Sequence, residues 1–279
     1  MSDAEAASRL ATLAPIGLDE LIERAALQTR VDRKYVIPIG ALPALLDGVD
    51  PRTQVLETAG VRDFRYESVY FDTPELTSYW MAARQRRRRF KMRTRSYVDS
   101  TAAYLEVKTK GARSATVKDR MEYVFEERRL LNQHGLDYVE DTLAGAGFTD
   151  VDLDSLAPTL ITRYRRTTLI VPGEAGDSRA TIDTHLDWAL DDERRMHTPG
   201  IVVIETKSGS RASPVDRHLW AHGHRPSTIS KYGTGLAALR PELASNKWTR
   251  VLTRHFRPDT APTPRHPIND QGITHAPLT

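Results

Sequence analysis

The feature that most constrains the fold of this chain is an alternation of polar and apolar residues with a period of two. Such alternation is typical of β-strands whose two faces meet different surroundings. It recurs in eight runs, at residues 31–39, 66–72, 88–98, 103–110, 116–126, 160–171, 180–190 and 201–207. Most connections between these runs are too short for repeated crossovers, so the sequence predicts a mainly antiparallel α+β fold.

Helical spacing of apolar residues predicts helices at residues 40–46, 75–83, 129–146, 215–222 and 233–239. Before the first strand, Pro15 and Gly17 interrupt a segment rich in Ala, Leu and Glu, which predicts a frayed start and then one short amphipathic helix. The last residues carry repeated prolines and little to bury. We therefore expect an N-terminal helical extension at 1–27, a main domain at 28–240 and a C-terminal extension at 241–279, disordered from about 257.

The composition excludes several classes of protein. With 39% hydrophobic residues the chain can bury a core, so a wholly disordered protein is not expected. The 279 residues include no cysteine, which excludes disulfides, thiolate zinc sites, iron–sulfur clusters and cysteine nucleophiles. No apolar run approaches the roughly 20 residues of a membrane helix, and Asp3 and Glu5 do not suit a signal peptide. We expect a cytoplasmic protein without membrane insertion.

Like charges gather on one face of the predicted strand at 89–98. Arg89, Lys91, Arg93 and Arg95 occupy the odd positions there, and the even positions include the apolar residues Phe90, Met92 and Val98. In a strand these charges would lie about 7 Å apart in a row, twice the rise per residue. Such a row repels itself, and it also has the shape needed to hold a chain of phosphates.

Other predicted strands repeat this polar design. Their charged residues are Glu106, Lys108 and Lys110; Lys118, Arg120 and Glu122; Arg163 and Arg165; Arg179 and Asp183; Glu205 and Lys207. The solvated outer face of a half-buried sheet is one explanation for any single strand. A closed barrel with the charged faces turned inward explains why Arg and Lys recur with isolated carboxylates.

A basic interior requires an anion or solvent, because buried like charges need compensation. Arginine binds phosphate oxygens in a bidentate way, and lysine supplies a point charge. The sparse carboxylates would then hold a divalent cation that bridges phosphate oxygens. The residues themselves therefore indicate a polyanionic ligand.

The order and spacing of several short motifs resemble a known family. The motifs are Asp32-Arg33-Lys34-Tyr35, Tyr70-Phe71-Asp72-Thr73, Lys91-x-Arg93-x-Arg95-x-Tyr97, Glu106-x-Lys108, Tyr164-x-Arg166, Thr181-x-Asp183, Glu205-x-Lys207 and Ser230-Lys231-Tyr232. Together they resemble the VTC domain of polyphosphate polymerases, a branch of the triphosphate tunnel metalloenzyme (CYTH-like) superfamily. The resemblance covers about residues 28–240.

This resemblance implies a closed eight-stranded antiparallel β tunnel barrel with peripheral helices. It implies an ATP-polyphosphate phosphotransferase that adds the γ-phosphate of ATP to a growing polyphosphate, with Mn²⁺ or Mg²⁺ as cofactor. The implied catalytic residues are Arg93, Arg95, Lys108, Lys207 and Lys231. The implied phosphate-binding residues are Lys34, Lys91, Lys118, Arg120, Arg163, Arg165 and Arg179, and the implied metal ligands are Glu205, Glu106 and Glu122.

One departure from the superfamily bears on the activity. Its Glu-x-Glu-x-Lys motif reads Arg30-x-Asp32-x-Lys34 here, so one acid is lost. This favours transfer over hydrolysis, because a phosphate acceptor is already ionised whereas water must be activated. An inorganic or nucleoside triphosphatase and a non-catalytic polyphosphate-binding sensor remain alternatives. The expected partners are ATP and polyphosphate, with a separate membrane protein if synthesis is coupled to transport, and without nucleic acid.

Three further patterns have plainer explanations. Residues 233–238 match a dinucleotide fingerprint, but no βαβ pattern surrounds them, so a helix start is expected. His218 and His222 lie four residues apart and could bind a metal, although an exposed helix face is the simpler interpretation. The arginine-rich tract at 84–88 could be a nucleic-acid patch, although a solvated junction between a helix and a strand is the simpler interpretation.

Overall fold

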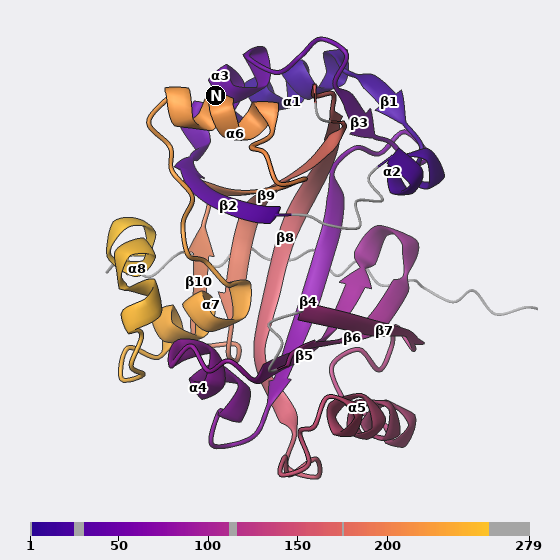
Figure 1. Cartoon of the computed structure of the whole chain (residues 1–279), viewed down its shortest axis with the longest axis vertical. Helices are drawn as coiled ribbons and strands as arrows, with labels where there is room; N and C mark the ends of the chain where they lie inside the picture. Colours follow the sequence, from indigo (N-terminus) through magenta and orange to yellow (C-terminus); the bar gives the residue numbers. More distant parts are fainter. Residues whose placement is uncertain (1, 25–30, 112–115, 175, 257–279) are drawn as a thin grey trace, which may run out of the picture.

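The computed structural model describes residues 2–24, 31–111, 116–174 and 176–256. A path of eight strands crosses its sheet in the order β2-β11-β9-β8-β4-β5-β6-β7 (Figure 1). Their bounds are β2 (Val31–Pro38), β4 (Phe64–Asp72), β5 (Arg89–Tyr97), β6 (Ala102–Lys110), β7 (Thr116–Tyr123), β8 (Ala157–Val171), β9 (Ser178–Ala189) and β11 (Ile201–Ser208). All neighbours on this path are antiparallel, which confirms the predicted α+β fold with a large antiparallel sheet.

Three short strands join the sheet beside this path. They are β1 (Ala14–Ile16), β3 (Gln54–Leu56) and β10 (Arg195–Thr198). β1 pairs in parallel with β3, β3 pairs with β8, and β10 pairs with β9. The sequence analysis missed them because three or four residues are too few to show an alternation.

Six of the eight helices in the described ranges lie where the sequence predicts them, with shifted ends. The eight helices are α1 (Ser2–Thr12), α2 (Leu18–Arg24), α3 (Leu42–Asp47), α4 (Thr77–Ala83), α5 (Gln133–Gly145), α6 (Pro214–Ala221), α7 (Lys231–Leu239) and α8 (Thr249–His255), with short 3₁₀ turns η1 (Ile39–Ala41), η2 (Val98–Ser100) and η3 (Asn246–Trp248). Side chains of Asn132, Ser213 and Ser230 cap the first turns of α5, α6 and α7. These caps place each helix start after a polar residue.

The N-terminal segment differs from the expected frayed start. Residues 2–12 form the helix α1, and its Ala6 is buried while Leu10 packs against the same core. This tertiary packing stabilises a helix that would be marginal by itself. Helix α8 was not predicted, while residues 25–27 and the segment from 257, where disorder was expected, lie outside the described residues.

Two apolar cores cover the outer face of the sheet. One lies beneath α1, α3 and α6 and includes Tyr35, Leu169 and Ile204. The other lies beneath α5 and includes Met92 and Leu105. Because apolar residues of each strand face these cores, the alternating charged residues must face the other side.

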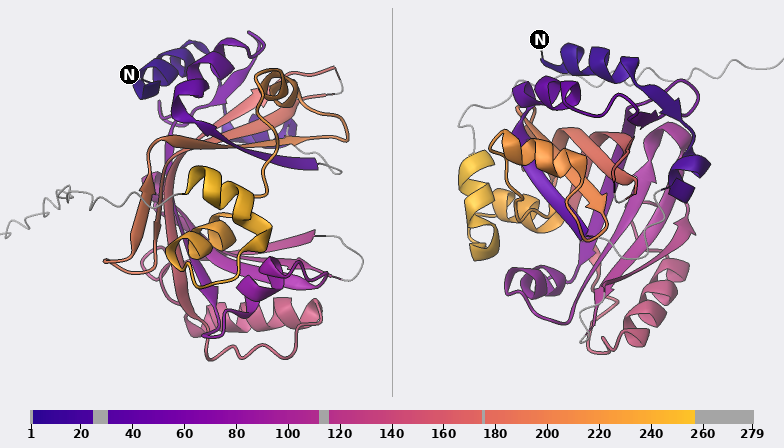
Figure 2. Two further views of the ribbon diagram at one scale, coloured as in Figure 1. Left: turned by 90° about the vertical axis from the view of Figure 1, so that its left-hand side faces the viewer. Right: turned by 45° about the horizontal axis from the view of Figure 1, so that its top comes forward.

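A third core lies on the opposite side of the sheet, where α4, α7 and α8 pack. Figure 2 shows α7 and α8 between the strands β2 and β11 and the strands β5 to β7. The Ser227 amide donates to the Lys34 carbonyl of β2 over 2.7 Å, and the Lys247 ammonium donates to the Ala82 carbonyl over 3.0 Å. These bonds join the loop before α7 to β2, and the turn η3 before α8 to α4.

The strands β2 and β7 end the path, and no pairing joins them within the described part of the chain. The eight strands of the predicted tunnel are therefore present in one curled sheet, whereas its closure stays a prediction. In the ranges that the structure covers, no helix has the length and apolar character needed to span a bilayer.

Candidate functional site

The charged residues of neighbouring strands meet on the face of the sheet opposite α5, which we call the inner face. The register places Lys91 opposite Lys108, Arg93 opposite Glu106, and Glu205 opposite Lys34. The sheet curls around this face (Figure 1), so that Lys34 and Glu205 on one side lie near enough to Lys91 on the other to act on its pKa, beside the larger effects of burial and Arg93. Side chains distant along the sheet therefore surround a common space.

Glu106 is the centre of the first cluster on this face. It is 2% exposed, and Arg93 donates to its Oε2 from Nε over 3.0 Å and from Nη2 over 2.8 Å. Lys118 Nζ lies 2.7 Å from Oε1, and Arg95 Nη2 lies 3.5 Å from Oε2. Burial alone would raise the pKa of Glu106, but the charges of Arg93 and Lys118 lower it to about 2. The carboxylate is thus ionised and holds three cations together.

Lys91 and Lys108 lie beside this cluster without a carboxylate of their own. Among the residues described, neither ammonium forms an ion pair, and Lys91 Nζ lies 5.5 Å from the centre of the Tyr70 ring. Burial and the charge of Arg93 lower the pKa of Lys91 to about 7 and that of Lys108 to about 6. An anion bound between them would reverse this effect by favouring their charged forms.

A second cluster joins helix α7 to the sheet through Asp183. Arg166 donates to Asp183 from Nε over 2.6 Å and from Nη2 over 2.8 Å, and Lys231 donates to the same carboxylate. The Lys231 ammonium lies 4.4 Å from the centre of the Tyr164 ring. Because Lys231 is the first residue of α7, the positive end of that helix also points to this cluster.

Glu205 lies between the cations of β2 and β11. Its Oε1 is 3.2 Å from the Lys207 ammonium, and Lys34 stands opposite it in the register. Although burial would raise the pKa of Glu205, the charges of Lys34 and Lys207 hold it well below its usual range. Glu205 is therefore ionised at neutral pH.

The predicted metal ligands do not form a cage by themselves. In the described ranges, no group of three or more Asp, Glu or His side chains could hold a metal ion. Glu106 is engaged by three cations, and Glu122 is exposed on β7. Glu205 fits a metal that arrives with phosphates, since Mg²⁺ takes one or two carboxylates together with phosphate oxygens and waters.

Most of the predicted phosphate ligands do share the inner face. The register places there Lys34, Lys91, Arg93, Arg95, Lys108, Lys118, Arg120, Arg179 and Lys207, and Lys231 reaches it from α7. Arg120 stands opposite Glu106, with its guanidinium 5.0 Å from the centre of the Tyr104 ring. Arg30, part of the altered first motif, lies outside the described residues.

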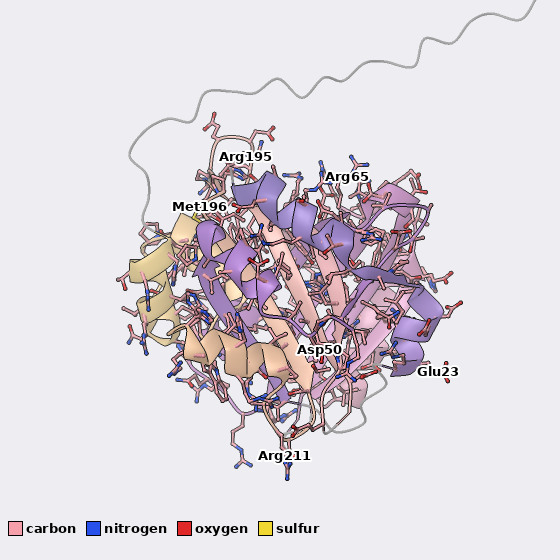
Figure 3. All side chains as sticks on the ribbon, turned by 90° about the horizontal axis from the view of Figure 1, so that it is seen from above. Glu23, Asp50, Arg65, Arg195, Met196 and Arg211 are labelled. Atoms are coloured by element: carbon pink, nitrogen blue, oxygen red, sulfur yellow. The ribbon has the colours of Figure 1, made fainter. Side chains whose placement is uncertain are left out.

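The expected placement of Arg163 and Arg165 on this face is wrong. They stand opposite Glu67 and Arg65 of β4 on the outer face, where Arg163 binds Glu67 and Asp187. Arg165 binds Asp63 there. The neighbouring outer-face residues Arg65 and Arg195 lie at one edge of the molecule in the view from above (Figure 3).

The inner-face arginine of β8 is Arg166, which was not among the predicted site residues. Tyr164 and Arg166 alternate with Arg163 and Arg165, and Tyr164 stacks on Tyr66 with ring centres 5.3 Å apart. Because residues 163, 165 and 166 are all arginines, the sequence does not show which of them faces inward. The aromatic residue Tyr164 could have indicated the buried face. Asp183 was also missed as an ion-pair partner, because its partners are distant in the sequence.

Comparisons with known proteins found a matching family model and several similar solved structures. A family model described as the VTC domain matches residues 29–240. No curated protein sequence matches the chain. Among solved structures, the proposed adenylyl cyclase HpAC1 from Hippeastrum, described as having a dominant triphosphatase activity, is 14% identical and aligns over 74% of this chain and 94% of its own with a TM-score of 0.45. A conserved hypothetical protein from Pyrococcus furiosus is 12% identical over 70% of this chain and 88% of its own, with a TM-score of 0.35.

Proposed function

This chain belongs to the VTC-domain family, and on that premise we propose that it is a phosphotransferase that adds the γ-phosphate of ATP to a growing polyphosphate. The observation that carries the proposal is the pair of Lys91 and Lys108. Both ammonium groups lie on the inner face next to Arg93, and no described carboxylate pairs with either. Phosphate charges bound between the two lysines would favour their charged forms, so the site suits a polyanion.

The phosphate chain would lie along the inner face, within a tunnel whose wall is the eight-stranded path. Arg93, Arg95 and Lys118 would exchange part of their contact with Glu106 for phosphate oxygens. Arg166 and Lys231 would do the same on the other side of the space, where they now share Asp183. Two polyanions can then be brought together, which is the main requirement of phosphoryl transfer.

Transfer to a phosphate end needs no general base, because that nucleophile is already ionised. Glu106 and Asp183 are occupied by cations, so neither is placed to activate water. This supports transfer over triphosphate hydrolysis. The remaining contribution of the chain is to position the reacting groups and to neutralise charge on the transferred phosphoryl group.

We also propose that Glu205 holds Mn²⁺ or Mg²⁺ together with phosphate oxygens. Such an ion neutralises charge on the β- and γ-phosphates when it is bound. Lys34 and Lys207 flank Glu205 and would orient the same phosphates.

One assay tests these roles together. The purified full chain is incubated with ATP and Mn²⁺ or Mg²⁺, with and without a short polyphosphate primer, while ADP, free phosphate and chain length are followed. We expect ADP together with lengthening chains. Free phosphate without chains would mean a triphosphatase, and tight polyphosphate binding without turnover would mean a sensor, so either result would contradict the proposal.

A further inference from the structure

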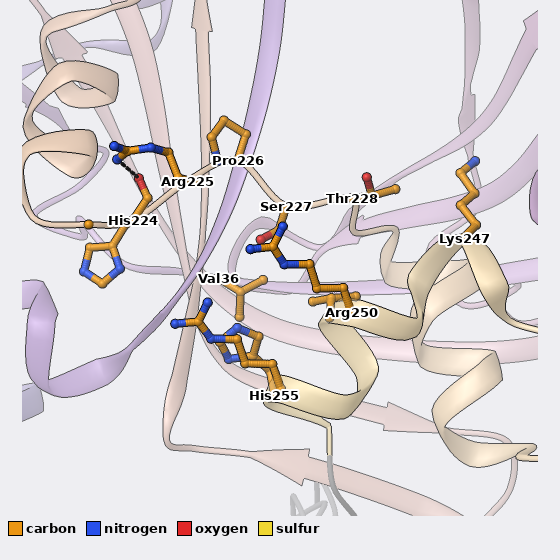
Figure 4. Close-up of a pocket in the computed structure, with 12 residues that line it drawn as sticks. Val36, His224, Arg225, Pro226, Ser227, Thr228, Lys247, Arg250 and His255 are labelled. Atoms are coloured by element: carbon orange, nitrogen blue, oxygen red, sulfur yellow. Dashed lines mark hydrogen bonds between the residues drawn. The ribbon is translucent and has the colours of Figure 1, made fainter.

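A second basic site lies outside the inner face. It is a cavity of about 180 Å³ between the loop at residues 223–228 and helix α8 (Figure 4). The basic residues that line it are His224, Arg225, Lys247, Arg250, Arg254 and His255. None of the motifs that resemble the VTC domain includes any of these residues.

No carboxylate of the described residues compensates the positive charges of this cavity at Lys247, Arg250 and Arg254. Within the part of the chain that the structure covers, no carboxylate lies at ion-pair distance from Lys247, Arg250 or Arg254. Lys247 donates to the Ala82 carbonyl over 3.0 Å, and Arg225 donates to the Trp220 carbonyl over 2.6 Å. Carbonyl partners hold these side chains in place without neutralising their charge, so the cavity attracts anions.

The histidines of the cavity report this positive potential. Burial lowers the pKa of His224, and the charges of His222 and Arg254 lower it further. Burial and the charge of Arg254 lower the pKa of His255 in the same way. The charge of Arg254 thus acts on both walls of the cavity, the loop and the helix.

The cavity lies beside strand β2, which contributes Lys34 to the inner face. Val36 lines it, and Val36 is two residues from Lys34 on β2, a distance of about 7 Å along the strand. The loop of the cavity is fixed to the same strand by the bond from the Ser227 amide to the Lys34 carbonyl. On the opposite side, the charges of Arg89 and Lys110 act on the pKa of Lys247, so these cations also lie close together.

We propose that this cavity is an accessory subsite for the distal segment of an inorganic polyphosphate chain whose reacting end lies on the inner face. The inference rests on the proposed function. Among the described residues that line the cavity, none is Phe, Tyr or Trp, so it lacks the rings on which nucleobases stack. Its cations suit a ligand that is recognised by negative charge without a nucleobase. Its position beside Lys34 suits a ligand that extends out of the inner face.

The test compares a short and a long ligand. Binding of tripolyphosphate and of a long polyphosphate to the full chain is measured by calorimetry at several salt concentrations. The variant R250A/R254A should bind long polyphosphate about tenfold more weakly than the unaltered protein at low salt. It should also reduce the slope of log affinity against log salt by about 2, while tripolyphosphate binds as before.

A matched control removes two other exposed arginines. Arg52 and Arg194 have side chains that are 77% and 63% exposed, so R52A/R194A makes the same change of net charge. The proposal is overturned if R250A/R254A loses no more long-chain affinity than this control, or if it loses tripolyphosphate affinity equally. It is also overturned if single-stranded DNA shows the same loss, which would indicate a general polyanion surface.

The same binding measurements distinguish failure of the subsite from failure of the proposed function. If the unaltered protein binds both ligands and R250A/R254A binds them as the control does, the subsite fails while the inner-face function stands. If the unaltered protein binds neither ligand, the proposed function fails, and the subsite fails with it.

Discussion

Lys91 of β5 lies directly opposite Lys108 of β6, and both ammonium groups face the same buried space as Arg93. Their pKa values, lowered to about 7 and about 6, leave much of this pair uncharged near pH 8. The space therefore contains several basic side chains but carries less positive charge than their number suggests until an anion binds. Ligand binding and protonation are coupled as a result.

We predict proton uptake when tripolyphosphate binds at about pH 8, because phosphate charges raise the pKa of both lysines. The affinity should rise as the pH falls from about 9 to about 7, and below about pH 6 protonation of the terminal phosphate opposes this trend. Calorimetry in buffers of different ionisation enthalpy counts the protons. Lys108→Met should reduce the number, and a count of zero for the unaltered protein would contradict the coupling.

Lys91 and Lys108 also affect how the stability of the ligand-free protein depends on pH. Because the pKa values of Lys91 and Lys108 are lower in the folded than in the unfolded state, the unfolded chain binds more protons between about pH 7 and pH 10. The contribution of these two groups to stability therefore decreases as the pH falls through that window. Lys91→Met should flatten the dependence of the melting temperature on pH, and an unchanged profile would count against the assigned cause.

Glu205→Gln should reduce metal-dependent turnover about 100-fold or more, because the amide is a poor ligand for Mn²⁺ or Mg²⁺. Polyphosphate should bind equally or more tightly, since a negative charge has left the inner face. ADP formation across a metal titration measures the first effect, and calorimetry measures the second. Glu122→Gln, at an exposed position of β7, is the control. Full activity of Glu205→Gln would remove Glu205 from metal binding.

Arg93→Ala should weaken tripolyphosphate binding and destabilise the protein by about 3 kcal/mol. Arg93 is 7% exposed and donates twice to the buried Glu106, so its loss leaves that carboxylate with fewer partners. Calorimetry and urea denaturation measure the two effects. Arg165→Ala, on the outer face, should leave tripolyphosphate binding unchanged. Equal losses in both variants would mean that the two faces are assigned wrongly.

Asp183→Asn should lower the melting temperature, because Arg166 and Lys231 would lose the carboxylate that they share. Tripolyphosphate should then raise the melting temperature of this variant more than that of the unaltered protein, since its oxygens replace the missing charge. Thermal melts with and without the ligand give both values. Asp63→Asn, whose side chain is 41% exposed, should show neither effect. A variant that ligand does not stabilise would separate Asp183 from the phosphate site.

Gly235→Ala should destabilise the protein by about 1–3 kcal/mol. A Cβ at this position would clash with the Trp188 indole, which packs against α7. The glycines at 233 and 235 therefore serve close packing of a helix in the third core. Urea denaturation measures the cost, and Gly209→Ala, where nothing lies within 4 Å of the added carbon, is the control. Equal stability of the two variants would contradict this explanation.

The strands and most of the inner face could be predicted from the sequence because both depend on a local period of two. Arg93 and Glu106, for example, both lie at positions that alternate with the apolar residues of their strands, so both point to the inner face. In β8 the sequence leaves open which residues face inward, and the packing of Tyr164 on Tyr66 and the ion pair of Arg166 with Asp183 place Arg166 on the inner face. Local patterns fail where several residues of one kind are adjacent.

Long-range arrangements could not be predicted in this way. The link between Lys231 and Asp183 depends on where α7 packs, and 48 residues separate the two. The cavity beside α8 likewise combines a loop and a helix that no motif connects. The apolar pattern of the segment that forms α8 is too short to predict a helix. The structure shows that Val251 and Phe256 of this segment are buried in the third core.

Several of the inner-face cations are already paired with carboxylates of the protein, so a ligand can bind them only by replacing these carboxylates. Glu106 is the fixed counter-ion of Arg93, Arg95 and Lys118, and Asp183 is that of Arg166 and Lys231. An incoming anion must compete with these internal counter-ions at several points at once. A monovalent anion such as chloride can replace only one contact, whereas a phosphate chain replaces many. On the proposed function, these shared counter-ions favour long phosphate chains over small anions.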